Sequence, residues 1–109
     1  MCAPKSDIGA CRVIEHLVLF KVKAEAAPED STTMTQELRK LKEHIPEIQE
    51  ITCGVNTSNR NQGFTHGLLV RVRSQSDLEA YLAHPEHQRV AAQHIRPIIE
   101  SVIVVDYES

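Results

Sequence analysis

The stretch VIEHLVLFKVK, residues 13–23, decides the fold of this chain. Its residues alternate as they do in a β-strand, and the centre is apolar on both faces. Val18 and Phe20 lie on one face, while Leu17 and Leu19 lie on the other. An antiparallel strand with one wet face alternates apolar and polar residues, so this strand should be covered on both sides.

The remaining elements define an α+β fold. Met34, Leu38, Leu41 and Ile45 form one apolar stripe at helical spacing, and Asp30 or Ser31 is expected to cap this helix. After the first strand we expect a helix at about 28–44, strands at about 47–54 and 64–73, helices at about 75–83 and 85–96, and a strand at about 101–107. The order β-α-β-β-α-β predicts a ferredoxin-like protomer, with a four-stranded antiparallel sheet and helices on one face.

Length and composition indicate a single domain in the cytoplasm. The chain has 109 residues, which suits one domain at 13–109, and the polar residues 1–12 are interpreted as a disordered tail. Cys2, Cys11 and Cys53 form no CxxC pair, which favours three reduced thiols in a cytoplasmic protein.

Charge and hydropathy exclude two classes of partner. With 12 Lys and Arg against 15 Asp and Glu, the net charge is −3, so we expect no nucleic acid as a partner, because phosphates demand clustered cations. The apolar runs fall far short of the roughly 20 residues of a membrane helix, so we expect no membrane contact.

The face of the sheet without helices is apolar. It carries Leu17, Leu19, Leu69, Ile103 and Val105. An exposed apolar patch of this size on a small domain indicates association. The expected solution is a symmetric homodimer in which two sheets pack face to face.

Six histidines accompany only two Phe, two Tyr and no Trp. His16 and His66 each interrupt an apolar row of a strand, and each is either a hydrogen-bonded core residue or part of a pocket. Tyr81, His84 and His87 surround a helix break at Pro85, and this segment is either a solvated corner or the mouth of a pocket. A neutral imidazole is a suitable general base, and a phenol can donate to a carbonyl oxygen. Such a pair suits proton abstraction next to a carbonyl.

A metal site is a weaker interpretation. His84 and His87 have HxxH spacing, but zinc or iron sites need further ligands in register, so no metal is expected. His44 and His94 look ordinary.

Several motifs in this order resemble one family across residues 13–108. They are IEHLVLFKVK, IPEI followed by Gly54, QGFTHG, YLAHPEHQRV and VIVVDY. The set is similar to the stress-response A/B barrel proteins, whose ferredoxin-like protomers close as a homodimeric α+β barrel. Plant members include polyketide cyclases that use no cofactor and catalyse an intramolecular aldol condensation of a poly-β-ketone thioester.

The resemblance implies roles for individual residues. His87 would be the general base and Tyr81 the phenol that positions the substrate, while His16, His66 and His84 would be pocket histidines. The residues implied to line the pocket are Val18, Phe20, Leu68, Val102 and Val104.

The chain also departs from those cyclases. Met34, Thr35 and Leu38 replace aromatic residues, Cys53 replaces a tryptophan, and the final helix has one extra residue near Pro97. The cavity therefore differs, and the cyclases' substrate is not implied. The sequence favours a homodimer that binds a small carbonyl-bearing ligand in an apolar His/Tyr-lined pocket. The alternatives are a cofactor-free polyketide cyclase and, more weakly, a haem- or metal-using relative such as a monooxygenase.

Overall fold

The computed structural model describes residues 12–109. The expected tail, residues 1–12, lies outside the described residues except for Arg12. The elements are β1 (Ile14–Val22), α1 (Pro28–His44), β2 (Glu50–Val55), β3 (His66–Val72), α2 (Gln75–Ala83), α3 (Pro85–Val90), the π-helix η1 (Ala91–Ile95) and β4 (Ile99–Glu108). They confirm the ferredoxin-like α+β fold.

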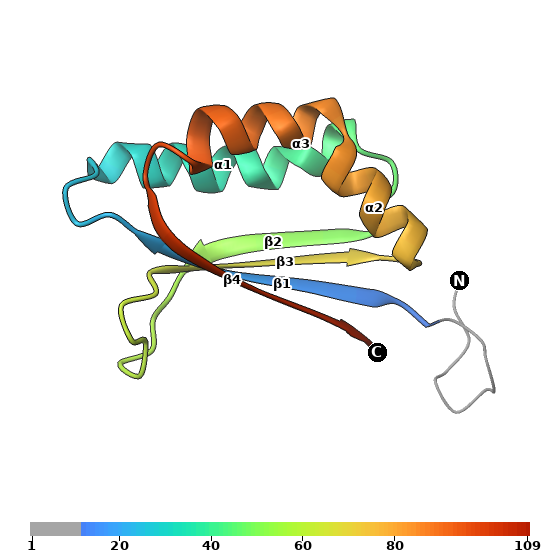
Figure 1. The fold of residues 1–109 in the computed structure, drawn as a ribbon, viewed down its shortest axis with the longest axis horizontal. Helices are drawn as coiled ribbons and strands as arrows, with labels where there is room; N and C mark the ends of the chain where they lie inside the picture. The colour runs from blue at the N-terminus through green and yellow to red at the C-terminus, as the bar shows by residue number, and fades with distance from the viewer. Residues whose placement is uncertain (1–11) are drawn as a thin grey trace.

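The four strands form one antiparallel sheet in the order β2-β3-β1-β4. The helices lie on one face of this sheet, and the other face is open (Figure 1). Among residues 12–109, no helix is both long and apolar enough to span a membrane.

The core lies between α1 and the centre of the sheet. The predicted stripe of α1 is confirmed, since Met34, Leu38, Leu41 and Ile45 are at most 1% exposed. These side chains belong to the same buried cluster as Val70 of β3. Apolar burial of this kind is the main stabilising contribution to such a domain.

The start of α1 differs from the expectation. The N-cap is Ala27, which makes no side-chain cap, and Pro28 occupies the first turn. Asp30 and Ser31 therefore lie inside the helix, and the predicted cap was wrong. Proline fits the first turn because its missing N–H would have no helical partner there. In α2, by contrast, the Ser74 hydroxyl accepts from the Asp77 amide at 3.1 Å, as a cap should.

The last helix is not a uniform α-helix over 85–96. It changes at Ala91 into η1, where the Arg96 amide donates to the Ala91 carbonyl at 2.9 Å, five residues back. A π-helical turn is the form in which a helix accommodates an inserted residue. This one lies just before Pro97, near the position where the family resemblance implies an extra residue.

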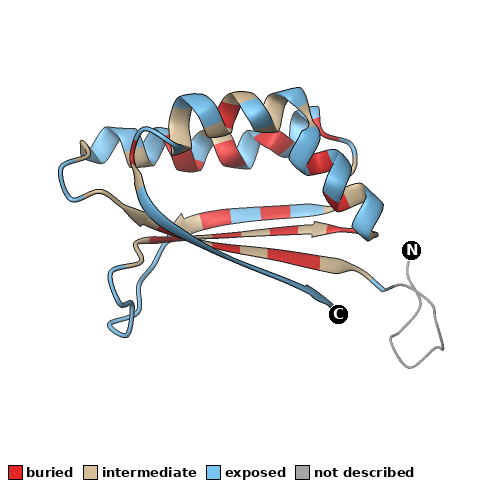
Figure 2. Cartoon of the chain, viewed as in Figure 1, coloured by how far each residue is buried: buried red, intermediate tan, exposed pale blue. Residues whose placement is uncertain are grey.

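The strand register confirms the predicted faces of the sheet. Leu17 pairs with Val105 and Leu19 with Ile103 on the open face, because directly paired residues share a face. On the helix-facing side Val18 pairs with Val104. The two faces of β4 are nevertheless alike in exposure, since every residue from 101 to 108 is exposed (Figure 2).

Candidate functional site

Three aromatic rings from three elements meet beneath the helix break. Tyr81 of α2 lies edge-on to His87 of α3, with ring centroids 4.7 Å apart, and edge-on to His16 of β1 at 5.9 Å. The break arises because His84 has an extended backbone and Pro85 begins α3. The three rings therefore lie together although they come from α2, α3 and β1.

Two polar atoms of this cluster are buried without a hydrogen-bond partner within the described part of the chain. They are the hydroxyl oxygen of Tyr81 and Nδ1 of His87. Tyr81 is fully buried, and burial raises the pKa of its phenol above the ordinary value. Burial is also the main cause that lowers the pKa of His87, with a smaller lowering from His16, whereas a hydrogen bond to the Leu82 backbone acts in the opposite direction. At neutral pH the pair is thus a neutral phenol beside a neutral imidazole.

Asp106 of β4 extends the cluster, although the sequence did not single it out. Its Oδ1 lies 2.5 Å from Nδ1 of His16 on the adjacent strand β1. An ionised carboxylate only accepts, so Nδ1 of His16 is the donor. The signal was present in the sequence as the single acid in SVIVVDY, but its partner became clear only with the pairing of β1 and β4.

His66 is buried on the same face of the sheet but lies elsewhere along it. It pairs with Phe20, whereas His16 pairs with Val70. Its Nδ1 lies 2.8 Å from the Thr65 hydroxyl, which donates to the Phe20 carbonyl. Burial lowers the pKa of His66.

Within residues 12–109, no hydrogen bond, ion pair or ring contact joins His66 to Tyr81 or His87. His84 lies between α2 and α3, where its Nδ1 accepts from the Glu86 amide at 3.1 Å and caps α3. The structure thus brings together His16, Tyr81 and His87, and gives His66 and His84 separate partners.

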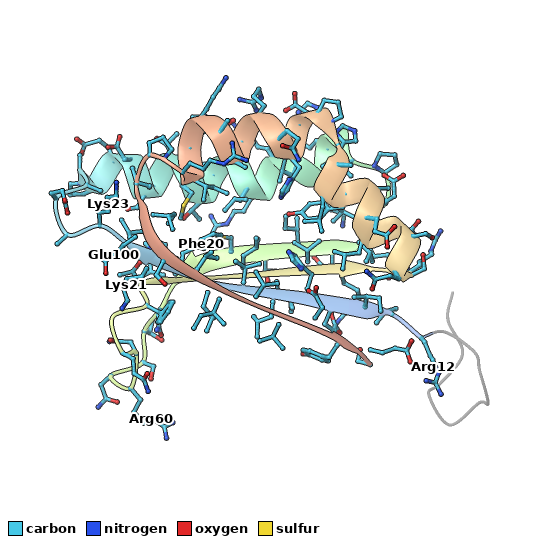
Figure 3. All side chains as sticks on the ribbon, viewed as in Figure 1. Arg12, Phe20, Lys21, Lys23, Arg60 and Glu100 are labelled. Carbon is cyan, nitrogen blue, oxygen red and sulfur yellow. The ribbon has the colours of Figure 1, made fainter. Side chains whose placement is uncertain are left out.

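The apolar residues implied to line a pocket share the helix-facing side of the sheet. Phe20, between the sheet and the helices in Figure 3, is 3% exposed, as is Leu68, and Val18 is 5% exposed. Val102 and Val104 continue these rows onto β4, but they are 50% and 51% exposed. The implied pocket residues on β1 and β3 are therefore buried under the helices, whereas those on β4 are exposed.

The other histidines have ordinary surroundings. His44 is exposed at the end of α1, and Nε2 of His94 lies 3.9 Å from a Glu37 carboxylate oxygen. In the described range 12–109, no group of three or more His, Cys, Asp or Glu side chains is arranged to hold a metal ion.

The fold and the buried rings define a ferredoxin-like α+β protein with a His/Tyr cluster under its helices. Residues 14–109 match the sequence model of the stress responsive A/B barrel domain, and the chain belongs to this family.

Two curated plant proteins illustrate the range of similar sequences. A stress-response A/B barrel domain-containing protein of Arabidopsis thaliana is 35% identical over 103 residues, which are 94% of this chain and 39% of that protein. Olivetolic acid cyclase of Cannabis sativa is 25% identical over 96 residues, which are 86% of this chain and 94% of the cyclase. The chain thus spans well under half the length of the first relative.

Solved structures share the fold closely. A hydroxynitrile lyase from Passiflora edulis has a TM-score of 0.81 at 21% identity, covering 89% of this chain and 93% of the lyase chain. A protein of unknown function from Bacteroides fragilis, described as dimeric and ferredoxin-like, has a TM-score of 0.75 at 25% identity, covering 89% and 96% of the two chains.

Proposed function

We propose that this chain is a homodimeric A/B barrel protein that binds a small carbonyl-bearing ligand in an apolar pocket beside Tyr81 and His87. The observation that carries the proposal is a pair of buried polar atoms on neighbouring rings, the Tyr81 hydroxyl and His87 Nδ1, neither of which has a hydrogen-bond partner among residues 12–109. Leaving such atoms unpaired costs about 1–3 kcal/mol each, so an explanation is required. A ligand that pairs with both atoms supplies one.

The chemistry of the two atoms selects the ligand class. The Tyr81 hydroxyl donates to an oxygen acceptor such as a ketone, and the neutral imidazole of His87 faces the adjacent acidic C–H or enol O–H. In this proposal a short hydrocarbon tail would lie against Val18 and Leu68, which are buried apolar side chains on the helix-facing side of the sheet. A β-diketone with an alkyl chain has these features.

The homodimer is supported by the open face of the sheet. Leu17, Leu19 and Leu69 are only partly buried there, and Ile103 and Val105 are 43% and 45% exposed. Exposed apolar surface of this extent favours association. The dimeric description of the Bacteroides fragilis neighbour supports the same arrangement.

A second candidate is a cofactor-free polyketide cyclase. It is favoured by the neutral imidazole beside the phenol and by the likeness to olivetolic acid cyclase. His87 would take a proton from the carbon between two carbonyls of a poly-β-ketone thioester, while Tyr81 donates to the developing enolate oxygen. The carbanion then adds to a ketone of the same chain, the proton returns to the alkoxide, and loss of water leads to the aromatic ring.

A titration with nonane-2,4-dione tests the binding function. We expect saturable changes in amide NMR shifts around α2 and α3, and an affinity about tenfold lower in Tyr81→Phe, because one hydrogen bond is lost. His44→Gln, which alters an exposed histidine, should bind like the unsubstituted chain. Shifts that do not saturate would exclude this ligand class.

Turnover is tested with a poly-β-ketone thioester made in situ by a polyketide synthase. The cyclase function predicts an aromatic product that His87→Ala abolishes while the dimer persists, and that His44→Ala leaves unchanged. Absence of product with the unsubstituted chain would exclude the cyclase and leave ligand binding as the function.

A further inference from the structure

The break between α2 and α3 determines where the backbone of His87 lies. The helix layer changes direction at this break (Figure 1), and His87 belongs to the first turn of α3, two residues after Pro85. Proline has no N–H, so the amide of Glu86 is the first in α3 that needs an acceptor. Nδ1 of His84 is that acceptor, at 3.1 Å. The turn that carries His87 therefore begins on a side-chain cap made by another histidine.

The last turn of α2 provides a second contact to this turn of α3. Leu82 lies in that last turn, where carbonyls generally lack a partner within the helix, and Nε2 of Gln88 in α3 donates to the Leu82 carbonyl at 2.8 Å. A hydrogen bond between His87 and the Leu82 backbone also raises the pKa of His87, against the effect of burial. Such a bond stabilises the protonated ring, so a ring N–H of His87 donates and the carbonyl accepts.

These contacts favour one tautomer of His87. Nδ1 is buried and has no hydrogen-bond partner among residues 12–109, so the nitrogen that donates to Leu82 is Nε2. A neutral imidazole has a single N–H, which leaves Nδ1 as an acceptor without a proton. Nδ1 and the Tyr81 hydroxyl are not bonded to each other either, although the two ring centroids are 4.7 Å apart. The site thus offers one acceptor and one donor on neighbouring rings.

A ligand that pairs with both atoms must itself have one donor and one acceptor. The diketo form of a β-diketone has two acceptors and no donor, whereas its enol form has a hydroxyl and a carbonyl. The enol hydroxyl can donate to Nδ1 of His87 while the carbonyl accepts from the Tyr81 hydroxyl. The opposite tautomer of His87 would make both protein atoms donors, and these would fit the diketo form instead.

We propose that His84 is a positioning residue: by capping α3 it holds Nε2 of His87 on the Leu82 carbonyl, which leaves Nδ1 unprotonated and makes the site select the enol form of a β-dicarbonyl ligand. This inference rests on the ligand class of the proposed function, and it adds the form of the ligand and the residue that determines it. Asn is an ordinary cap at the start of a helix, so His84→Asn should keep the function that His84→Ala loses.

The tautomer of His87 is measured on the ligand-free protein at neutral pH, from the nitrogen-15 shifts of its ring and their long-range proton correlations in NMR. We expect an Nε2–H pattern in the unsubstituted chain and in His84→Asn, and an average of both tautomers in His84→Ala. His44→Ala removes an exposed histidine at the end of α1 and should keep the Nε2–H pattern. An Nδ1–H pattern in the unsubstituted chain, or an unchanged pattern in His84→Ala, would overturn the proposal.

Selection of the enol is measured with two ligands of similar size. The ligand 3-methylnonane-2,4-dione enolises between its carbonyls, whereas 3,3-dimethylnonane-2,4-dione does not, because its central carbon has no hydrogen. We expect the first to bind about tenfold more tightly, because the second leaves Nδ1 of His87 unpaired. His84→Ala should abolish this difference and His84→Asn should keep it. Equal affinities for the unsubstituted chain would overturn enol selection, whereas no binding of either dione by a chain with the Nε2–H pattern would refute the proposed ligand class instead.

Discussion

Strands β3 and β4 flank β1 on its two sides and differ in what covers them. Val18 of β1 has Leu68 of β3 as one neighbour and Val104 of β4 as the other. Leu68 is 3% exposed and Val104 is 51% exposed. Both strands are apolar, so the difference comes from their positions under or beyond the helices. The helices therefore cover β3 but not β4, and the apolar side chains of β4 stay exposed in one protomer.

Truncating the two neighbours of Val18 should produce the largest difference in stability. Leu68→Ala should lower the free energy of unfolding by about 2–5 kcal/mol, because it leaves a cavity in a packed core. Val104→Ala should cost less than about 1 kcal/mol, because little packing is lost at an exposed position. Urea unfolding of both variants checks this, and equal losses would contradict the difference in cover.

The next effect concerns the open face. Leu19→Asp should weaken the dimer about 100-fold or more, because it places an unpaired charge in the sheet–sheet interface. Gln36→Asp, on the exposed side of α1, adds the same carboxylate and should leave the dimer unchanged. Light scattering over a concentration series distinguishes them, and a Leu19→Asp variant that stays dimeric would show that another surface associates.

Acid should destabilise the covered half of the molecule. Burial lowers the pKa of His66 and His87 in the folded chain below the ordinary value of 6.5, so the unfolded chain binds more protons. Their contribution to stability is complete above pH 6.5 and is lost as the pH falls toward the lowered pKa values, with a slope of at most about 1.4 kcal/mol per pH unit for each histidine.

Unfolding measured between pH 7.5 and pH 5 checks this sign. His87→Leu should make the slope shallower, whereas His44→Gln should not change it, because His44 is exposed. Glu37, whose pKa is lowered mainly by Arg89, acts only below its ordinary value of 4.5 and stays outside the window. Greater stability at pH 5 than at pH 7.5 would reverse the interpretation.

The smallest expected effect is an increase in stability. Tyr81→Phe should raise the free energy of unfolding by about 1 kcal/mol, because it removes a buried hydroxyl that has no partner among the described residues. The same substitution should weaken binding of nonane-2,4-dione, so stability and affinity move in opposite directions. Thermal unfolding of the ligand-free protein provides the measurement, and a loss of stability would mean that the hydroxyl already has a partner, such as a bound water.

The sequence predicted which side chains lie on each face of the sheet, but it did not predict which of them the helices bury. Alternation alone places Leu17 and Leu19 on one face of β1 and Val18 and Phe20 on the other face, and the strand register agrees. Burial of Val102 and Val104 depends on where the helix layer ends, which alternation does not encode. The cap of α1 was missed for a local reason, since Pro28 starts the helix before Asp30.

Alternation also predicted part of the candidate site, but it did not give the pairing of the strands. His16 and His66 share a face by alternation, but only the register shows that they stand opposite different residues, Val70 and Phe20. The cluster of Tyr81 and His87 follows from the break at Pro85. Asp106 could be placed beside His16 only once β1 and β4 were known to be neighbours.

The π-helical turn η1 has a consequence for how this protein can be altered. It joins α3, which carries His87, to the segment that leads into β4 and Asp106. The π-helical turn accommodates one more residue than a regular α-helical turn. Deleting the exposed Ala92 should therefore restore a regular helix and shorten the chain between His87 and Asp106. Single-residue insertions and deletions at η1 should therefore change the spacing between His87 and Asp106. Because η1 lies outside the sheet, the register of the strands need not change.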